Sequence, residues 1–489
     1  MLKRSVIMLS LIFLVISIVS LHAERIENVE IVSDSSAAIE CADLTAKMSG
    51  QEFTEERLEW LAFKIISQLE NNGYPFAQVR LNDLSLTEGG TLNIGIEVTR
   101  GPLSVFDSAK VSGVDARTRD FLERIATIES GGVFSQAEID RTIDLYKQMR
   151  YLNAEDSAVL DFHDDFARCT PTFHVTRKPT NLVEGSLGYQ PGYADQDAYV
   201  RGYARVEIEN ILGRGRRFSI AYEKKNPQSH NVQMGFYQPF LFYQPLSLSA
   251  EIEQQKFDSL YKELSASSSL EYNEFGSVSV RVNGGWQRFT PEGSRYIGVF
   301  HARRWWWGAG VTLNSSSPRL KQSLELDISY GVKQSYSFAG VKPDKSRVDD
   351  TRLEALYNAW LPLSSTIGMQ FVVDAAGIIT DETDISQTDL YKLGGAKKLR
   401  GYREDRFLTE RYVMVSLQPT FSFAANARFH LFADGAMFRV ESGGNLERYG
   451  GGAGFVFDLP GGSLLIDAAW GKNDSLDEGK LYMILESRF

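Results

Sequence analysis

The chain has 489 residues and a formal net charge of -11, with 29 Phe, 21 Tyr, 41 Gly and only 14 Pro. An acidic balance without a basic face argues against nucleic acid as a partner. A composition rich in aromatic residues and glycine is typical of a transmembrane β-barrel, in which only alternate residues of each strand face lipid.

Residues 1–23 have the pattern of an export signal that is removed after translocation. Lys3 and Arg4 precede an apolar run over residues 6–19, and Ala23 ends a small-residue exit. The run falls short of the roughly 20 apolar residues that span a bilayer as a helix, so a retained anchor helix is the less favoured alternative. We therefore expect an exported chain.

Cys41 and Cys169 are the only cysteines of the sequence. Export would permit a disulfide between them, but they fall in different predicted domains, so we expect them to stay unpaired. No paired-cysteine spacing occurs and the six histidines are scattered, so we expect neither a metal site nor a cofactor.

After the signal, residues 24–101 and 102–180 repeat one β-α-α-β-β pattern. The first segment is expected to contain a strand at 26–32, a short helical stretch, a helix at 54–72 stopped by Gly73, and strands at 76–86 and 91–99. The second is expected to contain a strand at 106–111, helices at 116–127 and 135–149, and strands at 158–162 and 172–176. Ser135 and Glu138 have the spacing of a capping box. Tandem copies of a small α+β unit indicate a modular arm rather than a catalytic fold.

Between residues 181 and 489 helical periodicity gives way to strict alternation. In segments 245–253, 277–283 and 324–330, apolar residues occupy one face and polar residues the other. This suits a wall with hydrocarbon outside and water inside, although a soluble sandwich is the alternative for any single strand. About sixteen antiparallel strands are expected, an even number as in bacterial barrels, near residues 182, 198, 216, 230, 246, 264, 276, 295, 320, 350, 366, 407, 426, 448, 462 and 479.

The longest expected connection, residues 379–406, is a candidate functional loop, because unusually long loops usually carry function. It contains Leu393-Gly-Gly-Ala-Lys-Lys-Leu-Arg-Gly-Tyr402, whose glycines permit tight folding. If the loop folded into a polar lumen, Arg400 would need a carboxylate, and Asp434 lies on a nearby expected strand. From the residues alone, an exposed loop arginine in water is the more favoured interpretation.

The sequence contains no nucleophile elbow, phosphate loop or zinc-helix motif, so we expect no catalytic residues and no enzyme activity. Residues 450–454 are glycine-rich but open an expected strand, which indicates close strand packing. The acidic cluster of Asp381, Glu382 and Asp384 is expected to be solvated surface rather than a calcium site. Residues 305–307, all Trp, are expected in an interfacial aromatic belt.

Three motifs of this chain, in this order and spacing, resemble those of the BamA/TamA/FhaC superfamily of outer-membrane assembly and secretion proteins. Residues 209–215 are similar to its early barrel turn, through Asn210, Gly213 and Gly215. The loop string is similar to its sixth-loop motif, through Gly394, Gly395, Leu399, Arg400, Gly401 and Tyr402. Phe432 and Asp434 are similar to its Phe-x-Asp motif, although here Gly435 follows the aspartate directly.

The resemblance implies roles for these parts of the chain. The two α+β segments would be POTRA-like periplasmic domains, and residues 181–489 the barrel. Arg400 would lock the loop inside the barrel against Asp434, while Gly401 and Tyr402 would shape its tip. The first and last strands would form a gate, with Leu182, Gly185, Leu187, Leu481, Met483, Leu485 and Phe489 as its residues.

The function implied is movement of other polypeptides into or across the outer membrane of a Gram-negative bacterium. The expected partners are outer-membrane lipid, unfolded polypeptide clients and periplasmic or lipoprotein subunits. An assembly factor is the favoured interpretation. A two-partner secretion transporter is the first alternative, because two POTRA-like units suit it, and a passive porin or scaffold barrel is the second.

Overall fold

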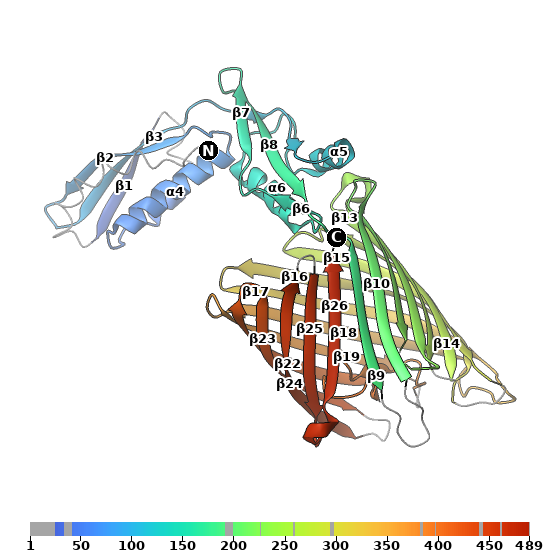
Figure 1. Cartoon of the computed structure of the whole chain (residues 1–489). Helices are drawn as coiled ribbons and strands as arrows, with labels where there is room; N and C mark the ends of the chain where they lie inside the picture. Colours follow the sequence, from blue (N-terminus) through green and yellow to red (C-terminus); the bar gives the residue numbers. More distant parts are fainter. Residues whose placement is uncertain are drawn as a thin grey trace. The chain divides into compact units, whose positions relative to one another are not determined.

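The computed structural model describes residues 25–33, 42–190, 199–224, 226–257, 260–293, 298–381, 385–396, 398–439, 444–459 and 462–488. The expected export signal and Cys41 lie outside them. The chain forms two compact units that divide after Arg177, whereas the sequence suggested a boundary near residue 180. Figure 1 shows the sheets and helices of the first unit and the long strands of the second.

The N-terminal module of the first unit is a three-stranded sheet packed on a helix. Its strands are β1 (Ile26–Ser33), β2 (Gln78–Leu86) and β3 (Leu92–Thr99), in the order β1-β3-β2, and its helices are α3 (Ala42–Ala46) and α4 (Glu55–Asn71). Thr54 caps α4, and Leu61, Ile65 and Leu69 on one face of this helix are fully buried. Gly73 follows the helix at φ 97°, as a C-terminal glycine does.

The second module is built around β8 (Arg168–Arg177). The strands β4 (Val105–Phe106), β5 (Lys110–Ser112), β6 (Leu152–Ala154) and β7 (Val159–His163) pair with β8, and the helices are α5 (Ala116–Ile125) and α6 (Gln136–Gln148). The single strand expected at 106–111 is wrong. Four steps from Phe106 to Lys110 oppose three steps from Cys169 to Thr172, so an extra residue bulges and divides the strand. Strand β6 was not expected.

The N-terminus of α6 is capped from the other module. Ser135 makes no side-chain cap, so the capping box expected with Glu138 is wrong. The carboxamide oxygen of Asn71, at the end of α4, instead accepts hydrogen bonds from Ala137 N at 2.8 Å and from the Ser135 hydroxyl at 3.2 Å. The sequence could not reveal this, because the acceptor lies 66 residues away from the amide that it satisfies.

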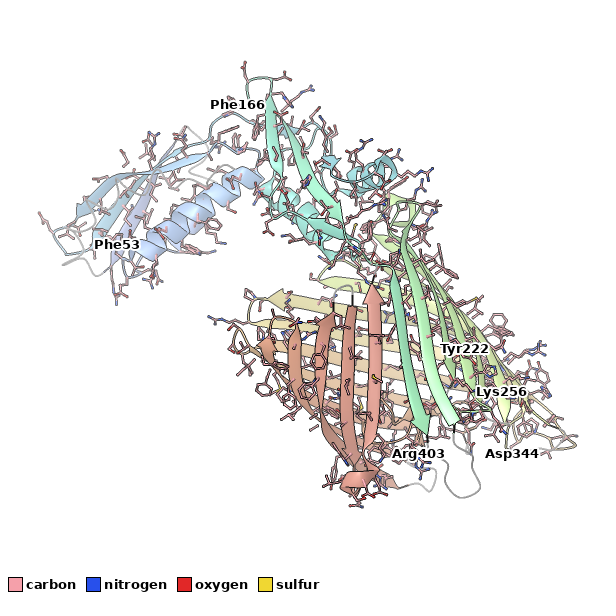
Figure 2. The ribbon with its side chains drawn as sticks, in the orientation of Figure 1. Phe53, Phe166, Tyr222, Lys256, Asp344 and Arg403 are labelled. Carbon is pink, nitrogen blue, oxygen red and sulfur yellow. The ribbon has the colours of Figure 1, made fainter. Side chains whose placement is uncertain are left out.

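Aromatic packing adds to the contact between the two modules. The ring of Phe76 lies 4.7 Å from that of Phe162 and 4.8 Å from that of Phe166, measured between centroids. Phe166 lies in the turn between β7 and β8 (Figure 2).

Cys169 is a free, fully buried thiol on β8. Burial raises its pKa to about 12, which leaves the thiol protonated and unreactive near neutral pH.

The second unit is a closed antiparallel barrel of 16 strands, and this expectation from the sequence is confirmed. In order, its strands are β9 (Leu182–Gln190), β10 (Tyr199–Ile211), β11 (Arg216–Lys224), β12 (His230–Gln238), β13 (Leu246–Phe257), β14 (Tyr261–Tyr272), β15 (Val278–Pro291), β16 (His301–Ser317), β17 (Leu320–Tyr336), β18 (Arg347–Pro362), β19 (Ile367–Thr380), β22 (Arg411–Ala424), β23 (Ala427–Arg439), β24 (Asn445–Leu459), β25 (Gly462–Gly471) and β26 (Lys480–Arg488). The 3-10 helices are η1 (Leu241–Tyr243) and η2 (Leu476–Glu478), and the short strands β20 (Tyr391–Leu393) and β21 (Phe407–Thr409) are not part of the wall.

The two faces of the barrel wall have different chemistry. Along β17, Leu326 and Ile328 are exposed at 46% and 52%, whereas Asp327 between them turns to the other face and pairs with Arg281 at 2.6 Å. The Trp run follows the same alternation, since Trp305 and Trp307 are exposed and Trp306 is not. Apolar side chains therefore cover the exterior and charged pairs line the lumen, as in a barrel that crosses a bilayer. No helix in the described part of the chain is long and apolar enough to span a membrane.

Replacing Ile328 with Arg tests which solvent surrounds the barrel. Ile328 lies at the middle of β17, on the apolar face. Arg at the midplane of a bilayer destabilises a barrel by about 2–4 kcal/mol. We expect this loss for Ile328→Arg in urea titrations of the protein refolded into lipid vesicles, and no comparable loss for the control Ile328→Leu. Equal unfolding midpoints for the two variants would contradict a lipid-facing wall.

Candidate functional site

The segment between β19 and β22, residues 381–410, is called the lumenal loop here. It contains β20 (Tyr391–Leu393) and β21 (Phe407–Thr409), which pair with each other. The wall strand expected near residue 407 therefore begins later, at Arg411, because residues 407–409 pair inside the loop. The side chains of the loop contact inward-facing groups on strands as far apart in the wall as β13, β18 and β23, so the loop lies within the barrel.

Arg400 is fixed to Asp434 of β23 by two charged hydrogen bonds. Arg400 Nε lies 2.8 Å from Asp434 Oδ2, and Arg400 Nη2 lies 2.9 Å from Asp434 Oδ1. The backbone N of Arg400 donates to the same carboxylate at 3.0 Å. Arg400 Nη1 donates to Gln418 at 2.9 Å, and Arg400 Nη2 donates to Ser416 at 3.3 Å.

Burial makes this pair a strong constraint on the loop. The side chains of Arg400 and Asp434 are only 12% and 3% exposed. The guanidinium also lies 3.6 Å from the centre of the Phe432 ring, a cation–π contact. Removing one partner of a buried ion pair costs about 3–5 kcal/mol, since the other charge is left unpaired.

A second carboxylate, which the sequence did not suggest, faces the guanidinium. Asp467 Oδ2 of β25 lies 3.7 Å from Arg400 Nη1, and Asp467 Oδ1 lies 2.9 Å from Nε2 of the buried His430. The loop arginine thus enters a pocket with two carboxylates from β23 and β25. The strands β23 and β24 separate β25, which carries Asp467, from β22, which follows the loop. This partner therefore becomes evident only once the barrel is closed.

Glycines on the loop and the wall allow their backbones to touch. Gly401 has φ 96°, and a Cβ there would lie 2.5 Å from Trp470 C. A Cβ on Gly450 would lie 2.1 Å from Arg400 O. The sequence predicted that residues 450–454 open a strand, but they lie inside β24. The first of these glycines makes room for the loop tip.

The other loop residues singled out by the sequence also hold the tip. Leu399 is fully buried, and Gly394 and Gly395 have φ 111° and 116°, which favour glycine. The hydroxyl of Tyr402 donates to Tyr449 O at 3.0 Å and accepts from Lys472 N at 2.8 Å. Among the acidic residues of the loop, Asp381 pairs with Lys345 at 2.8 Å, while Glu382 and Asp384 lie outside the described residues.

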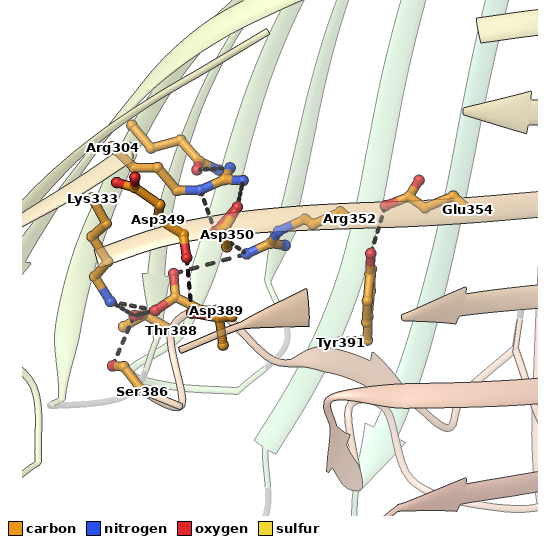
Figure 3. A network of polar contacts seen from close by, with 12 residues as sticks. Arg304, Lys333, Asp349, Asp350, Arg352, Glu354, Ser386, Thr388, Asp389 and Tyr391 are labelled. Atoms are coloured by element: carbon orange, nitrogen blue, oxygen red, sulfur yellow. Dashed lines mark hydrogen bonds and ion pairs between the residues drawn. The ribbon is translucent and has the colours of Figure 1, made fainter. Parts of the chain in front are cut away.

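The loop has a second buried contact with the wall, at Asp389 (Figure 3). Lys333 of β17 forms an ion pair with Asp389, and Arg352 of β18 lies 3.9 Å from it. In the same part of the wall, Arg304 of β16 binds Asp350 of β18 through Nε at 2.9 Å and Nη2 at 2.5 Å. Sequence reasoning missed this cluster, because its members come from four separate segments that share no motif.

The early barrel turn joins β10 to β11. Asn210, Gly213 and Gly215 all have positive φ, and Asn210 Oδ1 accepts a hydrogen bond from Gly215 N at 3.0 Å. Because the strands run alternately up and down, this turn lies at the opposite end of the barrel from the base of the lumenal loop. The structure does not bring these two motifs together.

The first and last strands close the barrel through a short seam. Among the described residues, β26 pairs with β9 at four positions, from Leu485 opposite Gly185 to Arg488 opposite Leu182. Leu481, Met483 and Leu485 are exposed on the apolar face, whereas the side chain of Leu182 is buried. Leu187 is placed through its backbone pairing with Gly202, and Phe489 lies outside the described residues.

Replacing Arg400 with Ala should release the tip of the lumenal loop. The variant leaves Asp434 buried and unpaired, at a cost of about 3–5 kcal/mol. We expect faster hydrogen–deuterium exchange over residues 391–409 and unchanged exchange in β13–β16. The control Arg403→Ala removes an exposed arginine from the same loop (Figure 2) and should exchange like the wild type. Unaltered exchange in Arg400→Ala would show that the pair does not hold the loop.

Comparison with known proteins agrees with this geometry. The Omp85 superfamily domain matches residues 329–488, which contain the lumenal loop and Asp434. The fold is similar to BamA from Haemophilus ducreyi lacking POTRA domains 1–3 (TM-score 0.55, 15% identity, covering 95% of this chain and 100% of that one). It is also similar to CdiB from Escherichia coli (TM-score 0.64, 13% identity, covering 96% of this chain and 91% of that one). CdiB from Acinetobacter baumannii is similar too (TM-score 0.60, 12% identity, covering 96% of this chain and 90% of that one). No curated protein sequence matches. Residues 329–488 thus form an Omp85 superfamily domain, and Omp85 barrels lie in the outer membrane of Gram-negative bacteria.

Proposed function

We propose that this protein assembles other proteins into the outer membrane, and that incoming strands pair with β9 and β26 at the seam. The observation that carries the proposal is the shortness of this seam. In the described part of the chain, β26 and β9 pair at four positions, whereas β25 and β26 pair at eight and β9 and β10 at nine. The seam is therefore the junction that opens at the lowest cost in backbone hydrogen bonds.

Opening the seam would give a client strand the partner that lipid cannot provide. Each unsatisfied backbone group in a bilayer costs several kcal/mol, so a client strand needs a paired edge as it enters. In the described residues the backbone pairing of β26 with β9 stops at Leu485 and Gly185, whereas β26 continues its pairing with β25 and β9 its pairing with β10. These two short edges are where pairing with a client would begin.

The two α+β modules would hold clients before insertion, in the periplasm. In the first module the sheet order is β1-β3-β2, so β1 and β2 each leave one edge without a neighbouring strand in the described sheet. An extended client segment can add to such an edge through backbone hydrogen bonds, with little dependence on its sequence.

Export through the lumen is the second candidate function. It is supported by a loop that lies in the lumen and is held there by ion pairs, since such contacts can be released without breaking the wall. The same loop argues against a passive porin, because an anchored loop obstructs small solutes.

A disulfide across the seam tests the assembly function. Gly185 and Leu485 lie directly opposite each other, at a separation that suits cysteine pairing. In a background with Cys41→Ser and Cys169→Ala, oxidised Gly185→Cys/Leu485→Cys should deplete the outer membrane of β-barrel proteins after loss of the wild-type gene. Reduction should restore them. The control Ile466→Cys/Met483→Cys tethers β25 to β26, which pair at these residues, and should support normal content.

The outcomes separate the two candidates. A tethered seam that leaves outer-membrane content unchanged would contradict assembly through the seam. If the tethered protein still released one large secreted polypeptide, the lumenal transporter would take its place, because export through the lumen leaves the seam closed.

A further inference from the structure

The lumenal loop is held at two places, and the charges at these places are reversed. At the tip the loop supplies a cation, Arg400, to wall carboxylates. Eleven residues earlier it supplies a carboxylate, Asp389, to wall cations on β17 and β18. In the order of the wall, β19 and β22 separate β18 from β23, so the two contacts lie on different arcs of the barrel.

The carboxylate contact is as deeply buried as the arginine contact. The side chains of Lys333 and Asp389 are 8% and 6% exposed. Thr388, next to Asp389 in the loop, accepts a hydrogen bond from Lys333 Nζ at 3.3 Å. Such burial means that the loop carboxylate is a structural partner of the wall rather than a surface group that meets lysine by chance.

The two arginines of this cluster also have a carboxylate partner on the wall, which does not belong to the loop. Arg304 is bound to Asp350, and Arg352 lies 3.8 Å from the same carboxylate. Lys333, by contrast, has only Asp389 as a carboxylate within 4.0 Å among the described residues. Nε of Arg352 and Oδ1 of Asp389 are buried without a hydrogen-bond partner in the described part of the structure. Departure of the loop would thus leave Lys333 without its carboxylate, next to an arginine that still has Asp350 nearby, and so a basic site with spare donors.

The tip contact leaves the opposite charge behind. Without Arg400, Asp434 and Asp467 remain as buried carboxylates on β23 and β25, with Ser416 and His430 as their neighbours. The emptied lumen would have a basic pole at Lys333 and Arg352 and an acidic pole at Asp434 and Asp467. Unpaired buried charges are costly, so each pole favours occupation by a group of opposite sign.

We propose that these two poles form a polypeptide-binding site that the loop occupies as a resident ligand. The ligand class is a polypeptide segment with a carboxylate that reaches the basic pole and a guanidinium or ammonium group that reaches the acidic pole. The reversed charges also fix the direction in which such a segment lies. That the natural ligand is a segment of a client rests on the proposed function; the site itself does not.

Channel recordings on the purified full chain test the site. In Asp389→Asn/Arg400→Gln both loop charges are gone, and conductance across a planar bilayer should rise several-fold over the wild type. A synthetic peptide of residues 386–403 with the native sequence should then reduce this conductance. A peptide of the same composition in which the Asp and Arg corresponding to positions 389 and 400 are exchanged should block much less.

Two controls keep the outcome unambiguous. Lys345→Gln/Asp381→Asn removes an exposed ion pair between the β17–β18 connection and the start of the lumenal loop, with side chains 47% and 72% exposed, and should conduct like the wild type. If the double variant does not fold, as judged by heat-modifiable mobility, Asp389→Asn and Arg400→Gln are each tested with the same peptides.

Unchanged conductance in folded variants would overturn the anchoring, and equal block by the two peptides, or none, would overturn the two-pole site. Neither result depends on clients. Failure of this proposal is therefore distinguishable from failure of the assembly function, which is read from outer-membrane content.

Discussion

A guanidinium held between buried carboxylates inside a closed barrel is the interaction on which the rest of this structure depends. The guanidinium of Arg400 donates two hydrogen bonds to Asp434, and its Nη1 also lies close to Asp467. A cation can be buried at this depth only because the surrounding wall supplies compensating charge. The glycines at 401 and 450 serve the same contact, because they allow the backbone of the loop tip to approach the wall.

Barrel closure imposes an opposing constraint. A wall in lipid must pair every backbone group, which favours permanent closure, yet the proposed assembly function requires the wall to open somewhere. Among the described residues β26 and β9 pair at four positions, which lowers the cost of opening at this junction, whereas β16 and β17 pair at seventeen. The buried ion pairs of the loop place a second releasable contact inside the lumen. The molecule thus combines a rigid wall with two places where few interactions must break.

Several elements could be predicted because they depend on neighbouring residues alone. Alternation gave the number of wall strands, and helical spacing gave α4 and α6 to within a residue or two. The loop motif pointed to Arg400, and the resemblance supplied Asp434 as its partner. Three contacts that the sequence did not reveal share one cause. Asn71 replaces the Ser135 cap, Asp467 joins Arg400, and Lys333 meets Asp389, and in each case the partner is distant in the sequence.

The sequence by itself determined a two-faced wall, two α+β modules and a glycine-rich loop with an arginine at its tip, because periodicity and local backbone preference are properties of short segments. Only the tertiary structure decided which charges meet in the lumen, since closure of the barrel brings β17, β18 and β22–β25 to a single loop. Electrostatic partners are selected by distance in space, whereas the alternation of apolar and polar residues along a strand predicts only which side chains point inward.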